Sequence, residues 1–190
     1  MGDYPTMDDA QLMLAYARGD ADAFEVLYGR HKRALLQYIT NSCGSESFAN
    51  ELFQDVWLRV INGRDTYRVQ SPFNAWLYRI ARHRLIDHYR NQGRAPRMEN
   101  IEDKNLKNVF QLSLSPLTPE QQASIKQREN ELYGALQQLP DVQREAVLLR
   151  HIAGMSIAEI AVVVETGTET IKSRLRYAIS KLRTLLEQVS

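Results

Sequence analysis

Apolar residues recur at spacings of three and four along most of the chain, and no stretch alternates apolar and polar residues over the length of a strand. This periodicity predicts helices over residues 8–18, 22–42, 45–61 and 72–91. Ser71-Pro72 suits the start of the last of these, because serine caps a helix and proline in the first turn loses no hydrogen bond. We therefore expect an all-α protein.

The periodicity lapses from about residue 94, where asparagines, alternating charges and the run SLSPLTP predict a flexible linker. Thr118-Pro119-Glu120-Gln121 then predicts a new helix, with a capping box and a first-turn proline. We expect two small helical domains, residues 1–94 and 118–190, joined by a flexible linker over residues 95–117.

Two capping boxes near the C-terminus, Ser156–Glu159 and Thr166–Glu169, predict two helices separated by a short turn. This is the pattern of a helix-turn-helix, a DNA-binding motif. Its predicted inner face consists of Ile160, Val164, Ile171, Leu175, Ile179 and Leu182. Its predicted outer face carries residues that suit base edges and phosphates, Glu169, Lys172, Ser173 and Arg176. The alternative is a generic helical hairpin with a basic face, which the shortness of the first helix disfavours.

The net charge is only +1, but the charges are unevenly distributed. Residues 73–97 hold six arginines against one acid, and residues 168–183 hold five basic residues against one acid. Two separate basic clusters indicate two local contacts with an anionic partner. The alternative interpretation of both clusters is that they are simple solvated helix faces.

The first basic cluster places four residues on one stripe of the helix predicted over residues 72–91, namely Arg79, Arg82, His83 and Arg90. Such a stripe suits a phosphate backbone. Tyr67 and Arg68, in the preceding loop, and Trp76 add the aromatic and basic surface that unstacked bases favour. The alternative for Trp76 and Tyr78 is that both belong to the core.

Composition excludes several other classes of protein. The single cysteine, Cys43, rules out an internal disulfide and a multi-cysteine zinc site, and we expect it to be a small apolar filler. Motifs for nucleotide, zinc-protease or hydrolase chemistry are missing, and the pair His83 and Asp87 suits a salt-bridged surface better than a metal. The acidic start is no secretory signal, and the apolar runs are too short to span a bilayer. We expect a cytoplasmic protein that is not an enzyme, binds no cofactor or metal and does not insert into membranes.

Several segments together resemble bacterial sigma factors of the extracytoplasmic-function group. FNAWLYRIARHRLIDHYRN (73–91) resembles their promoter −10 binding helix, and FQDVWLRV (53–60) resembles the preceding helix, which docks on RNA polymerase. DADAFEVLYGRHKRAL (20–35) resembles the first conserved segment. Residues 139–183, from LPDVQREAVLLRHIAGMSIAEIA to TIKSRLRYAISKLR, resemble the fourth region, which reads the −35 element. The segments keep the family's order and cover most of the chain except the linker.

The resemblance implies a compact two-domain sigma factor that binds core RNA polymerase and promoter DNA, with an anti-sigma factor as a further possible partner. It assigns polymerase docking to Gln54, Asp55 and Trp57, and we expect the Asp55 side chain to be exposed. It assigns the −10 element to the stripe and loop described above: Arg79, Arg82, His83, Arg90, Tyr67 and Arg68. It assigns the −35 element to the second helix of the helix-turn-helix: Thr168, Thr170, Lys172, Ser173, Arg174 and Arg176.

One departure concerns the turn of the motif, where the family often has glycine and this chain has Glu165. A left-handed backbone is costly for glutamate, so we expect either a different turn conformation or one without a positive φ. Two other functions stay open on the sequence. One is a one-component regulator whose N-terminal domain senses a ligand or dimerises, and the other is a protein-binding helical adaptor.

Overall fold

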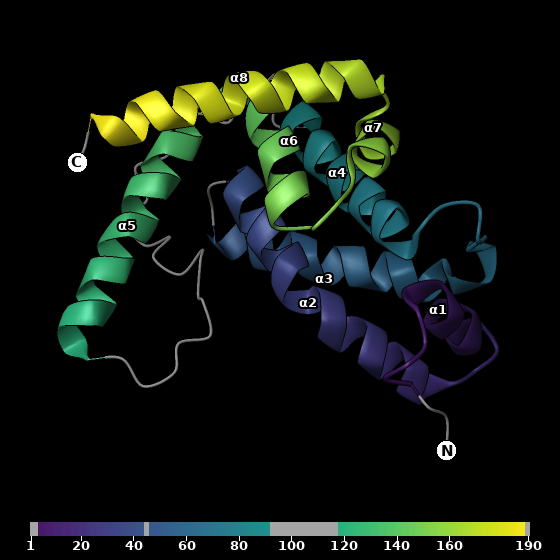
Figure 1. Ribbon diagram of the computed structural model, residues 1–190. Helices are drawn as coiled ribbons and strands as arrows, with labels where there is room; N and C mark the ends of the chain where they lie inside the picture. The colour runs from purple at the N-terminus through teal and green to yellow at the C-terminus, as the bar shows by residue number, and fades with distance from the viewer. Residues whose placement is uncertain (1–3, 44–45, 92–117, 189–190) are drawn as a thin grey trace.

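The structure, a computed structural model, describes residues 4–43, 46–91 and 118–188, and all its regular elements in those ranges are helices (Figure 1). The N-terminal unit consists of α1 (Asp9–Ala17), α2 (Ala21–Cys43), α3 (Glu46–Asn62), the short 3₁₀ helix η1 (Arg64–Thr66) and α4 (Phe73–Asn91). The C-terminal unit consists of α5 (Pro119–Gln137), α6 (Asp141–His151), α7 (Ile157–Val164) and α8 (Thr168–Glu187). The all-α prediction is confirmed. The linker predicted over residues 95–117 lies outside the described residues.

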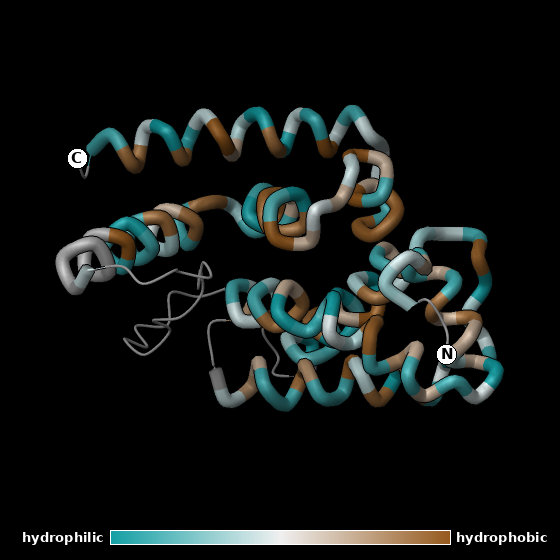
Figure 2. Tube along the Cα trace, turned by 60° about the horizontal axis from the view of Figure 1, so that its bottom comes forward, coloured by the Kyte–Doolittle hydropathy of each residue, from teal (hydrophilic) through white to brown (hydrophobic). Residues whose placement is uncertain are grey.

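The N-terminal unit packs α1, α3 and α4 around α2. The helix α1 starts at a capping box in which Asp8 accepts from the Gln11 backbone and Gln11 bonds back to the Asp8 backbone. Its Asp9 then binds Arg30 and His31 of α2, which fixes α1 against that helix. The apolar faces of the helices turn toward one another and the polar faces turn outward (Figure 2).

In the C-terminal unit, α8 lies across α5, α6 and α7 (Figure 1). The Arg144 guanidinium is 1% exposed and donates to the Gln137 carbonyl and to Asp141, so it joins the end of α5 to α6. The predicted capping box at the start of α7 is confirmed: Ser156 accepts from the Glu159 backbone at 3.2 Å, and Glu159 accepts from the Ser156 backbone at 2.8 Å.

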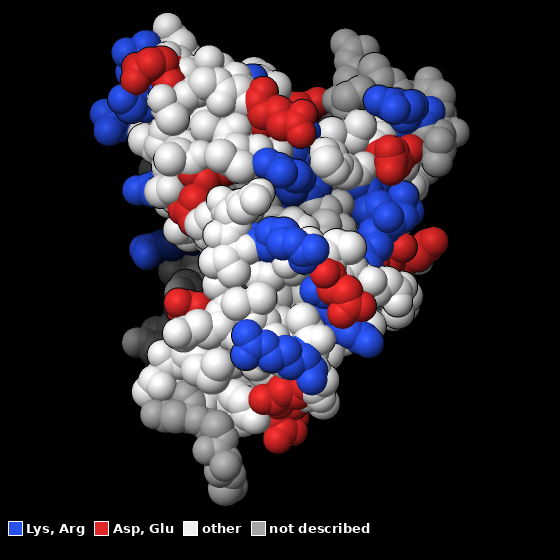
Figure 3. All heavy atoms as spheres, turned by 90° about the vertical axis from the view of Figure 1, so that its right-hand side faces the viewer, with Lys and Arg blue, Asp and Glu red and all other residues white. Residues whose placement is uncertain are grey.

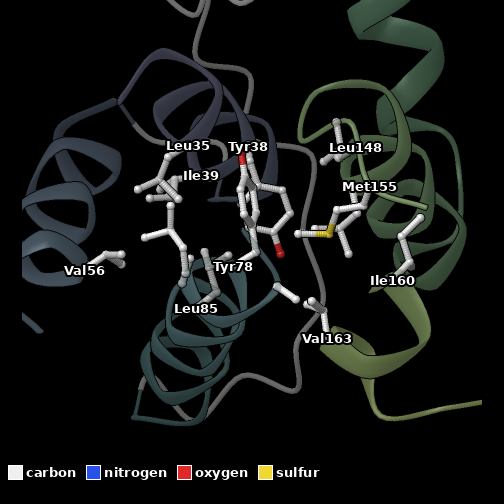
Figure 4. Close-up of a cluster of buried hydrophobic side chains, with 14 of the residues drawn as sticks. Leu35, Tyr38, Ile39, Val56, Tyr78, Leu85, Leu148, Met155, Ile160 and Val163 are labelled. Carbon is white, nitrogen blue, oxygen red and sulfur yellow. The ribbon is translucent and has the colours of Figure 1, made fainter. Parts of the chain in front are cut away.

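The two units share one buried apolar cluster. Tyr38 of α2 and Tyr78 of α4 lie at its centre, and Met155 and Val163 face them from the C-terminal unit (Figure 4). The helix contacts α4 with α7 and α2 with α6 join the units. Tyr78 is therefore a core residue, as one of the two sequence interpretations held, and Cys43 is a buried filler as expected.

Candidate polymerase and DNA interfaces

The helix-turn-helix is formed by α7 and α8. One residue of its turn has the left-handed backbone conformation that glycine usually adopts. Glu165 has φ 57° and ψ 51°, so both sequence-based alternatives for this turn were wrong. The backbone N–H groups of Glu165 and Thr166 both donate to the Ala161 carbonyl, which closes the end of α7. A left-handed glutamate stores strain at this point of the motif.

The second predicted capping box, over residues 166–169, is wrong. Gly167 is the N-cap of α8 and no side chain caps this end. The left-handed turn explains this difference. The Thr166 backbone N–H donates to the Ala161 carbonyl at the end of α7, so the N-cap of the next helix falls one residue later, at Gly167. The start of α8 thus leaves its first backbone N–H groups without a side-chain cap, as a phosphate-binding helix end would.

The first half of α8 separates into a buried and an exposed face. Ile171, Leu175 and Ala178 are buried against the rest of the unit. The exposed residues of the predicted −35 set are Thr168, Thr170, Lys172 and Arg176, and the half-buried ones are Ser173 and Arg174. Lys172 pairs with Glu169 at 2.7 Å, and the Arg176 guanidinium lies 5.1 Å from the centre of the Tyr177 ring. The exposed face therefore carries hydrogen-bond donors and acceptors that are open to solvent.

One predicted inner-face residue of α8 is misplaced. Ile179 is 48% exposed, whereas Leu182 is half-buried and Ala178 is fully buried. Ile179 lies one position past Ala178, and one residue turns a helix by about 100°, which moves its side chain off the packed line.

The predicted −10 residues of α4 lie in different surroundings. Arg79 donates from Nη2 to the Val162 carbonyl at 3.1 Å, and Arg82 donates from Nε to Glu145 at 2.9 Å. His83 is 53% exposed and lies 3.8 Å from Glu165. Arg90 is exposed at the end of the helix. The structure thus brings Arg79, Arg82 and His83 together on one stripe, but turns that stripe toward the C-terminal unit.

The loop before α4 combines one buried and one exposed predicted residue. The Tyr67 ring is 3% exposed and packs edge-on against Phe73 and Trp76, so burial raises the pKa of its hydroxyl. The Arg68 side chain is exposed and donates to the Asp65 and Tyr67 carbonyls. The Arg68 side chain is therefore open to solvent, whereas the Tyr67 ring packs on the inner side of the loop.

The predicted docking residues on α3 also differ in exposure. Gln54 is exposed, but Trp57 is 5% exposed within a cluster of aromatic rings that includes Phe24 and Tyr28. Asp55, which we expected to be exposed, is half-buried because Arg59 and Arg84 both bind its carboxylate. Burial raises the pKa of Asp55, but the two guanidinium groups outweigh burial and hold that pKa below its ordinary value.

Two residues that sequence reasoning missed lie between α3 and α4. Leu58 is 56% exposed, and Arg84 reaches from α4 to Asp55 of α3. Both line a hollow of about 1100 Å³ between these helices. An apolar residue directly after the buried Trp57 is the signal that could have identified Leu58, because it falls on the polar face of α3.

On the side of the molecule shown in Figure 3, lysine and arginine side chains alternate with acidic ones instead of forming a continuous basic patch. Within the described residues, no helix combines the length and hydrophobicity that crossing a membrane requires.

Comparison with known proteins agrees with this arrangement. Residues 27–95 match the family Sigma-70 region 2, and residues 129–182 match Sigma-70, region 4. RNA polymerase sigma factor NccH of Alcaligenes xylosoxydans xylosoxydans is 30% identical over 183 residues, covering 96% of both chains. The chain belongs to the extracytoplasmic-function group of the sigma-70 family. It is an RNA polymerase sigma factor.

Other relatives match this sigma factor over nearly its whole length. RNA polymerase sigma-H factor of Pseudomonas aeruginosa is 29% identical over 193 residues, covering 95% of this chain and 96% of that protein. The solved structure of CnrH in complex with the cytosolic domain of CnrY has a TM-score of 0.70 at 25% identity, covering 96% of this chain and 99% of that one. The region 2 match contains α3 and α4, and the region 4 match contains α6, α7 and most of α8.

Proposed function

We propose that this sigma factor docks on core RNA polymerase through α3, contacts the −10 element through α4 and its preceding loop, and reads the −35 element through the first half of α8. The residues in these roles are those predicted from sequence. Gln54 contacts polymerase directly, while Asp55 and Trp57 hold the docking helix in place, because Asp55 is half-buried and Trp57 buried in the free chain.

The observation that carries this proposal is that the first half of α8 has one buried face and one exposed face. Thr168, Thr170, Lys172 and Arg176 are exposed on a helix whose other face is anchored by Ile171 and Leu175. A recognition helix in a helix-turn-helix contacts bases with its N-terminal residues, and these positions fall in its first three turns. Hydroxyl, ammonium and guanidinium groups at these positions provide both base contacts and phosphate contacts.

We propose no catalytic residue in this protein, because its task is to position polymerase on DNA. Its place of work is then the cytoplasm, where polymerase and promoter DNA meet. We also propose that an anti-sigma factor regulates it. A solved sigma factor of the same fold, RpoE from Bartonella quintana, forms a complex with the anti-sigma factor NepR.

The role of α8 is tested by comparing Arg176→Ala with Arg183→Ala in transcription with purified core polymerase. Both variants remove an exposed guanidinium from the same helix, but Arg176 lies in the proposed reading half and Arg183 lies near the far end. Arg176→Ala should reduce initiation roughly ten-fold on promoters with a −35 element, from the loss of one base or phosphate contact. Arg183→Ala should stay close to wild type. Equal effects of the two variants would refute the assignment.

The one-component regulator is not favoured by the comparisons, and it makes a different prediction. It requires a dimer on a palindromic operator, because two-fold protein symmetry is matched by two-fold DNA symmetry. A stable one-to-one complex of the monomer with core polymerase, measured by size-exclusion chromatography with light scattering, would support the sigma factor. Operator binding by a dimer without polymerase would support the regulator.

A further inference from the structure

One acidic residue lies on the exposed face of α8 that we assign to the −35 element. Glu169 belongs to the first turn of the helix, and its side chain is 82% exposed. Lys172, Ser173 and Arg176 follow it at spacings of three, four and seven residues, which places all four residues on one side of the helix. This side of α8 therefore combines one carboxylate with two cationic side chains.

A carboxylate at this position opposes the attraction between the helix and DNA phosphates. Repulsion between Glu169 and the phosphate backbone would weaken binding to a duplex of any sequence, whereas Lys172 and Arg176 would strengthen it. The repulsion is offset where the carboxylate accepts a hydrogen bond from a base. Glu169 is therefore suited to discriminate between bases, because it rejects every sequence that offers it no donor.

The major groove offers a carboxylate two kinds of donor, the N4 amino group of cytosine and the N6 amino group of adenine. In adenine, the amino group lies beside the N7 acceptor of the same base, which repels the second oxygen of a carboxylate. A side-chain amide, with one donor and one acceptor, is the group that matches adenine. Cytosine presents its amino group without an acceptor of its own in the groove, so Glu169 should select cytosine.

Lys172 extends this recognition to the base opposite the cytosine. Its Nζ lies 2.7 Å from Glu169 Oε1, so the two side chains are joined in the absence of DNA. An ammonium group has three N–H donors, of which Glu169 uses one. The others are available to O6 and N7 of guanine, which lie next to the cytosine amino group in the groove of a C·G pair. The ion pair is thus complementary to one C·G base pair.

The rest of the C-terminal unit holds this ion pair in a fixed place. Ile171 and Leu175 are buried on the opposite side of α8. The helices that α8 packs against all lie on one side of it (Figure 1). An ion pair that is preorganised on an anchored helix loses less conformational entropy on binding than two free side chains would lose.

We propose that Glu169 and Lys172 act as one unit that reads a single C·G base pair of the −35 element, with Glu169 on the cytosine and Lys172 on its guanine. The inference rests on the proposed function of α8 and deepens it, because it names the base pair that is read. Glu169 determines specificity in this unit, since its carboxylate binds cytosine and is repelled by the surroundings of any other base.

The test uses the full-length protein bound to core polymerase and a promoter library whose −35 region is randomised. The −10 region comes from a promoter that the wild-type protein uses, and sequencing of the bound templates gives the base preference at each position. The wild-type protein should favour cytosine roughly ten-fold at one position. Glu169→Ala should lose this preference. Glu169→Gln should replace it with a preference for adenine, because glutamine matches N6 and N7 of that base.

Variants of Lys172 test whether the two residues read the same base pair. Lys172→Ala should reduce the preference at the same position, and combining it with Glu169→Ala should cause no further loss there, because the two residues act together. Lys172→Arg should keep the preference, since a guanidinium group also binds O6 and N7 of guanine. Glu187→Gln removes an exposed acid from the far end of α8 and should leave the whole profile unchanged.

Base preference also separates this role from a contribution of Glu169 to helix stability. An acid in the first turn stabilises a helix through the helix dipole, but this effect is the same on every DNA sequence. An unchanged cytosine preference in Glu169→Ala and Glu169→Gln, or a uniform gain on all sequences, would overturn the inference and leave the proposed function of α8 intact. A wild-type profile without any base preference in the −35 region would overturn both.

Discussion

Arg84 of α4 and Asp55 of α3 form an ion pair that joins the proposed −10 helix to the proposed docking helix. The same carboxylate accepts from Arg59 at 3.2 Å, and Arg84 also reaches Asp87 at 3.3 Å. A docking residue predicted to stand free on the surface is instead the centre of a small charged network. This network fixes the angle between the two helices that have to meet polymerase and DNA together.

Asp55 should therefore affect both stability and docking, whereas Gln54 should affect docking alone. Asp55→Arg would place a third guanidinium against Arg59 and Arg84, so we expect a lower melting temperature as well as weaker polymerase binding. Gln54→Ala removes an exposed amide and should weaken polymerase binding by a few-fold at unchanged stability. Thermal unfolding and a fluorescence titration with core polymerase separate the two effects.

The matched control is Glu25→Ala, an exposed position on α2 outside the proposed docking surface. The exchange Asp55→Arg with Arg84→Asp restores the opposite charges and should recover part of the lost stability. Polymerase affinity that is unaffected by both Gln54→Ala and Asp55→Arg would show that α3 is not the docking helix.

Replacing the left-handed glutamate should stabilise the C-terminal unit. Glu165 has φ 57°, so Glu165→Gly relieves backbone strain, offset by the greater freedom of glycine in the unfolded chain. We expect a net gain of about 0.5–1 kcal/mol in the free energy of unfolding, measured with urea.

Gly154 provides the control of opposite sign, because it has φ 66° and already uses the left-handed conformation. No atom lies within 4 Å of the position that a Cβ would take at Gly154, so Gly154→Ala measures the cost of the left-handed backbone without a steric clash. This variant should lose about 1 kcal/mol. Destabilisation by Glu165→Gly would mean that the glutamate side chain contributes more than its backbone conformation costs.

Acid should loosen the packing of α1. The hydrogen bond to His31 is the main reason why the pKa of Asp9 lies below its ordinary value of 3.8; burial opposes this, and Arg30 assists it. A carboxyl with a lowered pKa stabilises the fold above its unfolded pKa, and the contribution is lost as pH falls through the folded pKa, here below 3.8.

Asp9→Asn should therefore destabilise the protein at pH 6, by roughly 1 kcal/mol. The difference from wild type should shrink as the pH falls below 3.8. Asp22→Asn, an exposed acid at the start of α2, serves as the control and should change little at either pH. A penalty for Asp9→Asn that is constant with pH would contradict the pairing with His31.

Local rules predicted the helices well, because each helix start is a short-range feature. The capping box at Ser156 and the proline before α4 depend only on neighbouring residues. The start of α8 was misjudged by one residue, because the choice between capping a new helix and closing the old one depends on the backbone of Glu165.

The surroundings of the arginines in α4 could not be predicted from local rules. A basic stripe looks the same in sequence whether it faces solvent, DNA or another unit of the chain. Its partner Glu145 is 63 residues away from Arg82, and the pairing depends on how two whole units pack. The burial of Trp57 and Tyr67 has the same origin, since their apolar rings fill cores that sequence spacing alone does not locate.

The most direct measurement of the central claim is a map of transcription starts made in vitro with purified core polymerase and genomic DNA, with and without this sigma factor. The account predicts starts that depend on the protein and share two sequence elements, one near −10 and one near −35. It also predicts that Arg176→Ala weakens starts that carry the −35 element more than those that lack it. A map with no starts that depend on the protein would contradict the account.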